Sequence, residues 1–251
     1  MKPEIITAII AAIVAVISAI ISLIGQTRIV HLTDQFAKKR EAESREAQTT
    51  ALMSKYRDPL LRSAIDLQSR LFNLNKKGTL YEFYHHRSQA ERDYAIHNTQ
   101  YVIAEYFGWV EILRREIQFL DLGDIERNRR LSELLVNITK AFGTDSLERT
   151  LQLFNGEQRA IGEIMLISRS VKDSVKYECI GYATFVKKLS NPDFAKWFAK
   201  LKDDIDTMAI KPEINLKRLV VIHGRLIDLI DFLDPHCVRI QPENRTRIKE
   251  N

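Results

Sequence analysis

Side chains that could carry out chemistry are few in this 251-residue sequence, and they are widely spaced. Glu82 and His85 form one Glu-x-x-His pair. A di-iron bundle needs that pair on two helices together with further carboxylates, so one copy indicates no metal centre. The sequence also lacks a phosphate-binding Gly-rich loop, a GxSxG turn and an HExxH helix. It therefore predicts no catalytic, cofactor-binding or metal residues.

Two Arg–His pairs have a spacing that needs separate consideration. Arg92 precedes His97 in "RDYAIH", and Arg218 precedes His223 in "RLVVIH". Helical ribonucleases of the HEPN class place an Arg and a His a few residues apart at a dimer interface. A chain so rich in arginine yields about this number of matches by chance. The alternative interpretation is a solvated Arg92 and a structural pairing of Arg218 with His223 in the last helix.

Two carboxylates lie in apolar surroundings: Glu105 in "VIAEYFGWV" and Glu163 in "AIGEIMLI". A buried carboxylate needs a partner or a raised pKa. One hypothesis is therefore a functional cleft. The other is an internal salt bridge to an arginine such as Arg159 or Arg218.

The two cysteines, Cys179 and Cys237, have no partner at CxxC spacing. Neither a disulfide framework nor a zinc site is expected, and free thiols fit a reducing compartment. The net charge of +5, from 38 basic and 33 acidic residues, is too dispersed to indicate nucleic-acid binding.

The most informative element is the uncharged run "IITAIIAAIVAVISAIISLI", from Ile5 to Ile24. As a helix it covers about 30 Å, the thickness of a hydrocarbon core. A cleaved signal would have a shorter apolar run and a small-residue cleavage site, and a soluble core helix would carry some charge. The run therefore predicts a transmembrane helix, with the lipid bilayer as its surroundings.

The charges beside this run predict its orientation. Lys2 alone precedes it, whereas Arg28, Lys38, Lys39 and Arg40 follow it. Positive flanks stay in the cytoplasm. We therefore expect a single-pass protein of the cell inner membrane with the bulk of the chain in the cytoplasm.

Small side chains recur along one stripe of the run, at Ala8, Ala12, Ala15, Ala19 and Ser22. Such stripes let two helix backbones approach closely in lipid. The stripe predicts a homo-oligomer formed through the transmembrane helix, although alanine is common in such helices by composition alone.

Scarce Gly and Pro and 3.6-residue apolar spacing predict an all-α chain. We expect four segments: a transmembrane anchor (1–25), a charged helical stalk (26–55), a cytoplasmic helical bundle (56–240) and a disordered polar tail (241–251). Asp58 and Pro59 resemble a helix start, and Ser88 with Glu91 forms a capping box. We expect residues 79–87 to be irregular. Further helices are expected at 125–142, at about 147–154, from 156, and at 194–208. The apolar last helix before Pro235 is the candidate bundle centre. No strand pattern is recognised.

Three segments resemble an uncharacterised bacterial family of single-pass membrane proteins with a helical cytoplasmic domain. They are "YRDPLLRSAIDLQSRLFNL", "NGEQRAIGE" and "LIDLIDFLDP". The resemblance implies an anchor and a fold, not a chemistry. The sequence therefore predicts a membrane-anchored scaffold, sensor or protein-interaction module without its own catalysis and with an unidentified protein partner. The alternative is a membrane-tethered HEPN-like ribonuclease.

Overall fold

The structure is a computed structural model that describes residues 3–75, 79–117, 125–171, 174–211, 214 and 216–248. It is 79% helical and 4% strand, so the expected all-α character is confirmed in its main feature. In chain order the elements are α1 (Pro3–Asn75), α2 (Thr79–His85), α3 (Gln89–Ile117), α4 (Ile125–Gly143), α5 (Asn155–Ile164), β1 (Leu166–Val171), β2 (Ser174–Cys179), α6 (Tyr182–Lys188), α7 (Pro192–Ala195), η1 (Lys196–Phe198), α8 (Ala199–Ile210), α9 (Lys217–Leu233) and η2 (Pro242–Arg245).

The chain divides into two compact units, Met1–Leu52 and Met53–Asn251. The second unit is called the helical domain below. The four-segment division of the sequence remains a prediction, because the structure separates only these two units.

The first unit is helical over its described residues 3–52, and its described apolar side chains are exposed. Val14, Ile17, Ile20, Leu23 and Ile24 are each between 51% and 65% exposed. Within the described part of the chain, no helix is both long and apolar enough to cross a bilayer. Of the predicted self-association stripe, the side chains of Ala8, Ala12, Ala15 and Ala19 lie outside the described residues, and Ser22 is exposed.

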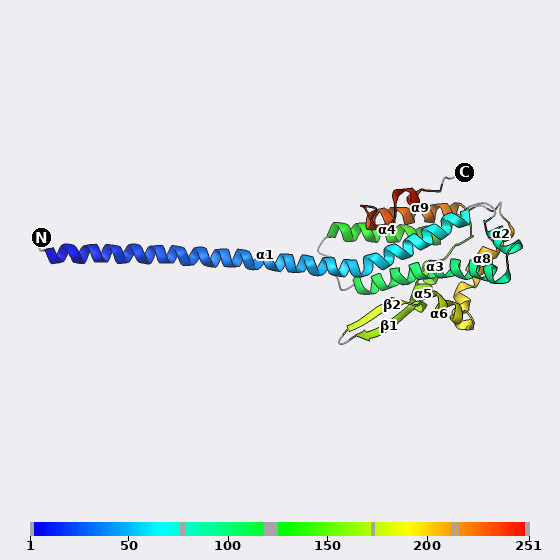
Figure 1. Cartoon of the computed structure of the whole chain (residues 1–251), viewed down its shortest axis with the longest axis horizontal. Helices are drawn as coiled ribbons and strands as arrows, with labels where there is room; N and C mark the ends of the chain where they lie inside the picture. The colour runs from blue at the N-terminus through cyan, green and yellow to red at the C-terminus, as the bar shows by residue number, and fades with distance from the viewer. Residues whose placement is uncertain are drawn as a thin grey trace. The chain divides into compact units, whose positions relative to one another are not determined.

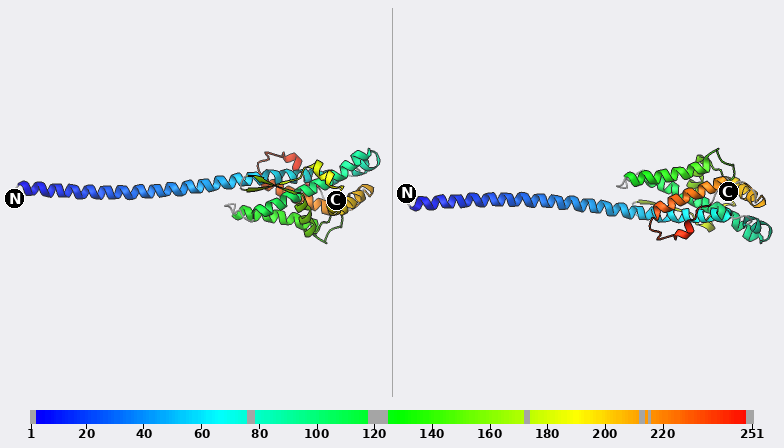
Figure 2. Two further views of the ribbon diagram at one scale, coloured as in Figure 1. Left: turned by 90° about the horizontal axis from the view of Figure 1, so that it is seen from below. Right: turned by 90° about the horizontal axis from the view of Figure 1, so that it is seen from above.

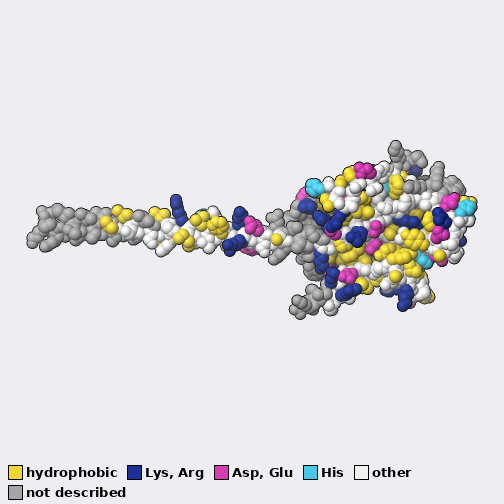
Figure 3. Space-filling view, viewed as in Figure 1, with side chains coloured by type: hydrophobic (Ala, Val, Ile, Leu, Met, Phe, Trp, Pro, Cys, Tyr) yellow, Lys and Arg dark blue, Asp and Glu magenta, His cyan; other side chains and the backbone are white. Residues whose placement is uncertain are grey.

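The helical domain is built around α3. This helix packs against α5 on one side, where the hairpin also contacts it, and α4 packs against α9 (Figures 1 and 2). Gly162 of α5 permits the close approach to α3, since a Cβ there would lie 2.8 Å from the carbonyl oxygen of Phe107. On the face shown in Figure 3, basic and acidic side chains are intermixed over the domain.

Several local predictions are confirmed. The Ser88 amide donates to Glu91 Oε2 at 3.0 Å and the Glu91 amide donates to Ser88 Oγ at 3.3 Å, which is the expected capping box. Helix α4 ends at Gly143. The apolar spacing at 194–208 buries Phe194 and Phe198, whose ring centroids lie 5.2 Å apart. The last helix, α9, was expected at the bundle centre; it has nine buried residues and packs against α4, but α3 contacts more of the other elements.

The absence of strands was a wrong prediction. β1 and β2 form an antiparallel hairpin in which Leu166 pairs with Cys179 and Ile167 with Glu178. The strand β2 carries a period-two pattern, because Tyr177 and Cys179 alternate with polar neighbours. Six residues of alternation were too short to stand out beside the long helical periodicities.

Helix boundaries were wrong at two places. Pro59 lies inside α1 and does not begin a new helix. A proline there removes one backbone hydrogen bond, and the burial of Leu60 and Leu61 against the core outweighs that loss. Residues 79–85, expected to be irregular, form α2, because Leu80 and Tyr84 are spaced to be buried on one helical face.

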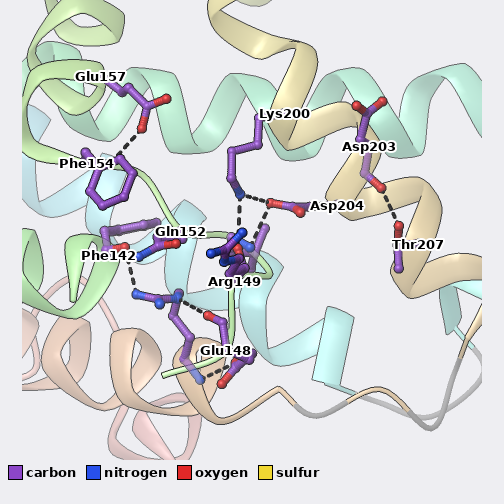
Figure 4. Close-up of polar contacts among 12 residues, drawn as sticks. Phe142, Glu148, Arg149, Gln152, Phe154, Glu157, Lys200, Asp203, Asp204 and Thr207 are labelled. Atoms are coloured by element: carbon purple, nitrogen blue, oxygen red, sulfur yellow. Dashed lines mark hydrogen bonds and ion pairs between the residues drawn. The ribbon is translucent and has the colours of Figure 1, made fainter. Parts of the chain in front are cut away.

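Residues 144–154, part of which was expected to be helical, form a loop between α4 and α5. Leu151 has a left-handed backbone (φ 59°), which a branched side chain rarely adopts. Its amide donates to Asp204 Oδ2 at 2.9 Å, and Lys200 bonds both Asp204 and the carbonyl of Arg149 (Figure 4). These contacts with α8 stabilise the loop against the helical alternative.

The expected disorder of the tail is wrong for the residues described up to Ile248. Arg245 Nη2 bonds Asp234 Oδ2 at 2.6 Å, and Arg247 Nη2 bonds Asp228 Oδ1 at 2.6 Å. Ion pairs to α9 and its C-terminal end thus hold a segment whose composition is polar.

Candidate functional site

A cleft of about 320 Å³ opens between α1, α3 and the start of α6. Its charged lining residues are Asp66, Arg70 and Glu105, and its aromatic lining residues are Tyr94, Tyr101 and Tyr182. The volume lies at the small end of the range for ligand pockets, which is about 300–1,000 Å³.

Helical periodicity brings these residues together. Asp66, Ser69, Arg70 and Asn73 share one face of α1 at spacings of three and four. The opposite face of this helix carries buried leucines, so packing of the apolar face orients the polar face. On α3 the lining residues Tyr94, Tyr101 and Glu105 follow the same periodicity.

Arg70 is half-buried at the wall of the cleft. Its Nε donates to Thr99 Oγ1 at 2.8 Å and its Nη2 donates to the Ala95 carbonyl at 2.7 Å. Both acceptors are neutral, and no described carboxylate forms an ion pair with this guanidinium. Burial lowers the pKa of Arg70 from its ordinary value, while the nearby hydroxyls of Tyr94 and Tyr182 oppose that shift.

The two carboxylates of the cleft both have pKa values raised from the ordinary values. For Glu105 the main cause is burial, and the charge of Asp66 adds to it, whereas a hydrogen bond from Tyr101 acts in the opposite direction. The Tyr101 hydroxyl donates to Glu105 Oε1 at 3.0 Å. Asp66 is exposed at the rim of the cleft, but partial desolvation still raises its pKa, against the charge of Arg62.

The aromatic side chains form a connected wall. Tyr182 lies edge-on to Tyr101, with ring centroids 5.4 Å apart, and edge-on to Tyr94 at 6.3 Å. Tyr101 in turn contacts Phe185, which is fully buried. The wall is therefore anchored in the core and presents ring surfaces and hydroxyls to the cleft.

A second cavity, of about 340 Å³, also has Glu105 in its lining, together with Tyr56, Trp109 and Cys179 among others. Burial raises the pKa of the Cys179 thiol, and the charge of Glu105 adds to that rise. The thiol therefore stays protonated near neutral pH and is a poor nucleophile. These features suit binding rather than covalent catalysis.

The Arg218–His223 pair is structural. Arg218 is 0% exposed, and its guanidinium donates to five backbone carbonyls at the end of α4 and in the following loop, at distances of 2.7–3.3 Å: Ala141, Phe142, Thr144, Leu147 and Glu148. The sticks of Phe142 and Glu148 in Figure 4 mark this junction. The carbonyls at the end of a helix lack intrahelical partners, and this side chain satisfies them.

His223 is also 0% exposed. Its Nε2 lies 2.9 Å from the amide nitrogen of Gln68, and Ser69 Oγ donates to the amide oxygen of Gln68. The amide therefore donates to Nε2, and Nδ1 has no partner among the described residues. Burial lowers the pKa of His223 to about 4, and the charge of Arg247 contributes to this shift.

The remaining predicted residues lie elsewhere. Arg92 stacks over the ring of Tyr84, 4.3 Å from its centroid, and His97 is half-buried on α3. Glu163 is exposed and approaches Arg115 at 3.9 Å, so the expected partners Arg159 and Arg218 were wrong. Among the described residues no group of three or more His, Cys, Asp or Glu side chains could hold a metal ion.

Of the residues singled out in the sequence, only Glu105 lines the cleft. Sequence reasoning missed Arg70, Asp66 and the three tyrosines. The available signal was the polar face of α1 opposite its leucine face, but such a face is ordinarily exposed to solvent. No protein-family model, curated protein or solved structure matches this chain.

Proposed function

We propose that this chain is a single-pass protein of the cell inner membrane, with a cytoplasmic helical domain that acts as an interaction or sensing module without catalysis of its own. The observation that carries the proposal is the twenty-residue run from Ile5 to Ile24, which contains no charge. Lipid is the solvent in which such a helix is stable, because its backbone is satisfied internally and its side chains are apolar.

The described side chains of this run support the proposal. Ile17, Leu23 and Ile24 are each more than half exposed on α1, and leaving each of them in water forgoes on the order of 1–2 kcal/mol. An acyl-chain environment would remove that penalty. The basic residues that follow the run favour a cytoplasmic location for the helical domain.

The non-catalytic part of the proposal rests on how the candidate groups are used. Arg218 and His223 are buried where α9 packs against α4 and α1, and both side chains form hydrogen bonds there. This Arg–His pair, one of the two that could belong to a ribonuclease, is therefore not accessible at the surface. Burial raises the pKa of the Cys179 thiol, which keeps it protonated near neutral pH.

Membrane extraction tests the anchor. Full-length chain should remain in the membrane pellet after alkaline carbonate treatment, whereas the double variant Ile13→Arg with Ile17→Arg should be released, since each arginine at the centre of a span costs about 3 kcal/mol. The matched control places the same two arginines at Ile29 and Leu32, beyond the run, and should stay in the pellet. Release of the wild-type chain by carbonate would refute the anchor.

Thiol labelling tests the orientation. Val238 is 77% exposed, so Val238→Cys offers an accessible thiol on the helical domain. In intact cells a membrane-impermeant maleimide should label Lys2→Cys above the wild-type background and should leave Val238→Cys at background. The reverse pattern would invert the topology.

A transmembrane reporter assay tests self-association. Ala15→Ile should separate the two backbones and weaken the pair by about 1 kcal/mol, because single contacts in lipid are weak. Ile13→Ala, which lies off the stripe, should have little effect. Equal signals from the wild-type run and both variants would show that the small residues of the stripe do not mediate self-association and only reflect the composition of the run.

A further inference from the structure

We propose that the cleft between α1 and α3 binds a small zwitterion, a molecule with one carboxylate and one ammonium group such as a free amino acid. The proposal goes beyond the membrane anchor and does not depend on it. It rests on charged groups of both signs that line one cleft, called its two ends below, and on the tyrosine rings that line the same cleft.

The first end is an anion site at Arg70. Its Nε and Nη2 are held by Thr99 and by the carbonyl of Ala95, which fixes the guanidinium plane. Nη1 has no acceptor among the described residues, and the charge has no carboxylate partner there. The hydroxyls of Tyr94 and Tyr182 lie near the same guanidinium and donate to no described acceptor. A planar guanidinium with adjacent hydroxyls suits a carboxylate.

The second end is a cation site at Asp66 and Glu105. Asp66 lies one helical turn before Arg70 on α1, and Glu105 lies across from it on α3. The charge of Asp66 raises the pKa of Glu105, and among the described residues no basic nitrogen lies within 4 Å of either carboxylate as an ion pair. The exposed Arg62, also on α1, acts in the opposite direction on the pKa values of both carboxylates. An ammonium group between the carboxylates would relieve the repulsion.

The tyrosine lining favours a compact ligand. The rings of Tyr101 and Tyr182 line the cleft, and tyrosine faces attract cations. A volume of about 320 Å³ holds a molecule of amino-acid size. A simple anion would meet the two carboxylates, and a simple cation would meet Arg70, so a ligand with both charges matches the lining best.

Calorimetry on the full-length chain in detergent micelles tests the proposal. The probes are glycine, γ-aminobutyrate and 6-aminohexanoate, which separate the two charges by increasing lengths, with butyrate and butylamine as single-charge controls. We expect at least one zwitterion to bind at least tenfold more tightly than both controls. Binding of butyrate or butylamine with equal affinity, or no binding by any zwitterion, would overturn it.

Variants locate the binding. Arg70→Gln and Asp66→Asn should each weaken the best probe at least tenfold, and Arg225→Gln, an equivalent change on the exposed face of α9, should not. Asp66 is exposed, so its variant decides the question even if Arg70→Gln unfolds. Wild-type affinity in the Asp66→Asn variant would refute the two-ended site.

The serine headgroup of an anionic lipid carries the same pair of charges. Titrations in nanodiscs with and without phosphatidylserine distinguish the two sources: competition by the lipid assigns the site to a headgroup, and unchanged affinity assigns it to a free molecule. Because binding is measured on extracted protein, failure of the membrane anchor would leave this result intact.

Discussion

Arg218 and Arg70 both place a guanidinium between helices without a carboxylate on its nitrogens, but they differ in how completely their donors are used. Arg218 is fully buried and reaches five backbone carbonyls. Arg70 is half-buried at the lining of the cleft, bonds two neutral acceptors and has no described acceptor for Nη1.

The difference separates a structural arginine from a binding arginine. A buried guanidinium whose N–H groups all bond protein carbonyls has no donor left for a ligand. Its removal leaves each of those carbonyls without a hydrogen-bond partner. A partly occupied cation beside a cavity keeps a donor and a charge available. Their residue type is the same, so only the inventory of partners distinguishes them.

The largest expected effect is that of Arg218→Met. Methionine fills similar space but leaves the end of α4 and the following loop with unpaired carbonyls, so we expect a loss of about 3–5 kcal/mol in the free energy of unfolding. Arg225→Met, on the exposed side of the same helix, should cost less than about 1 kcal/mol. Urea denaturation of the full-length chain measures both, and equal losses would remove the distinction between the two arginines.

The second prediction concerns His223, which lies on α9 one and a half turns from Arg218. Its folded pKa of about 4 lies below the ordinary value of 6.5, so the unfolded chain binds the proton more tightly. The contribution of His223 to the free energy of unfolding is therefore fully present above pH 6.5. It decreases as the pH drops toward 4, by up to about 3 kcal/mol.

His223→Gln should abolish this part of the pH dependence, because the amide does not titrate. His236→Gln, at an exposed position, should preserve it. Denaturation midpoints between pH 4 and 7 decide the matter. A wild-type slope in the His223 variant would assign the titration to another group.

The third effect is smaller. Arg70→Met loses two hydrogen bonds, but the two acceptors remain paired, because the Thr99 hydroxyl also donates to the Ala95 carbonyl. We expect a loss of about 1–2 kcal/mol. A loss as large as that of Arg218→Met would mean that Arg70 is structural and would break the comparison.

The smallest effect is expected for Glu105→Gln. Burial and the charge of Asp66 disfavour the ionised form, which is why the pKa of Glu105 is raised. Ionisation above that pKa therefore destabilises the fold, and the neutral amide should be stabilising at pH 7 by no more than about 0.5 kcal/mol. The gain should vanish at low pH, where the carboxyl is protonated, and a destabilisation at pH 7 would contradict the assignment.

The sequence by itself determined the features that depend on neighbouring residues. The capping box at Ser88 and Glu91, the end of α4 at Gly143 and the buried stripe through Phe194 and Phe198 follow from local hydrogen bonding and helical periodicity. Those signals operate within a few residues, so they can be read directly from the chain.

Only the tertiary structure decided the rest. Leu151 adopts its left-handed backbone because Asp204, 53 residues away, binds its amide. The structural role of Arg218 depends on tertiary packing, since the carbonyls that its guanidinium binds lie 70–77 residues earlier in the chain. The cleft exists because the polar faces of α1 and α3 are brought together by the burial of their apolar faces. Contacts of this kind have no local signature, since the free energy that selects them comes from burial and hydrogen bonding between distant segments.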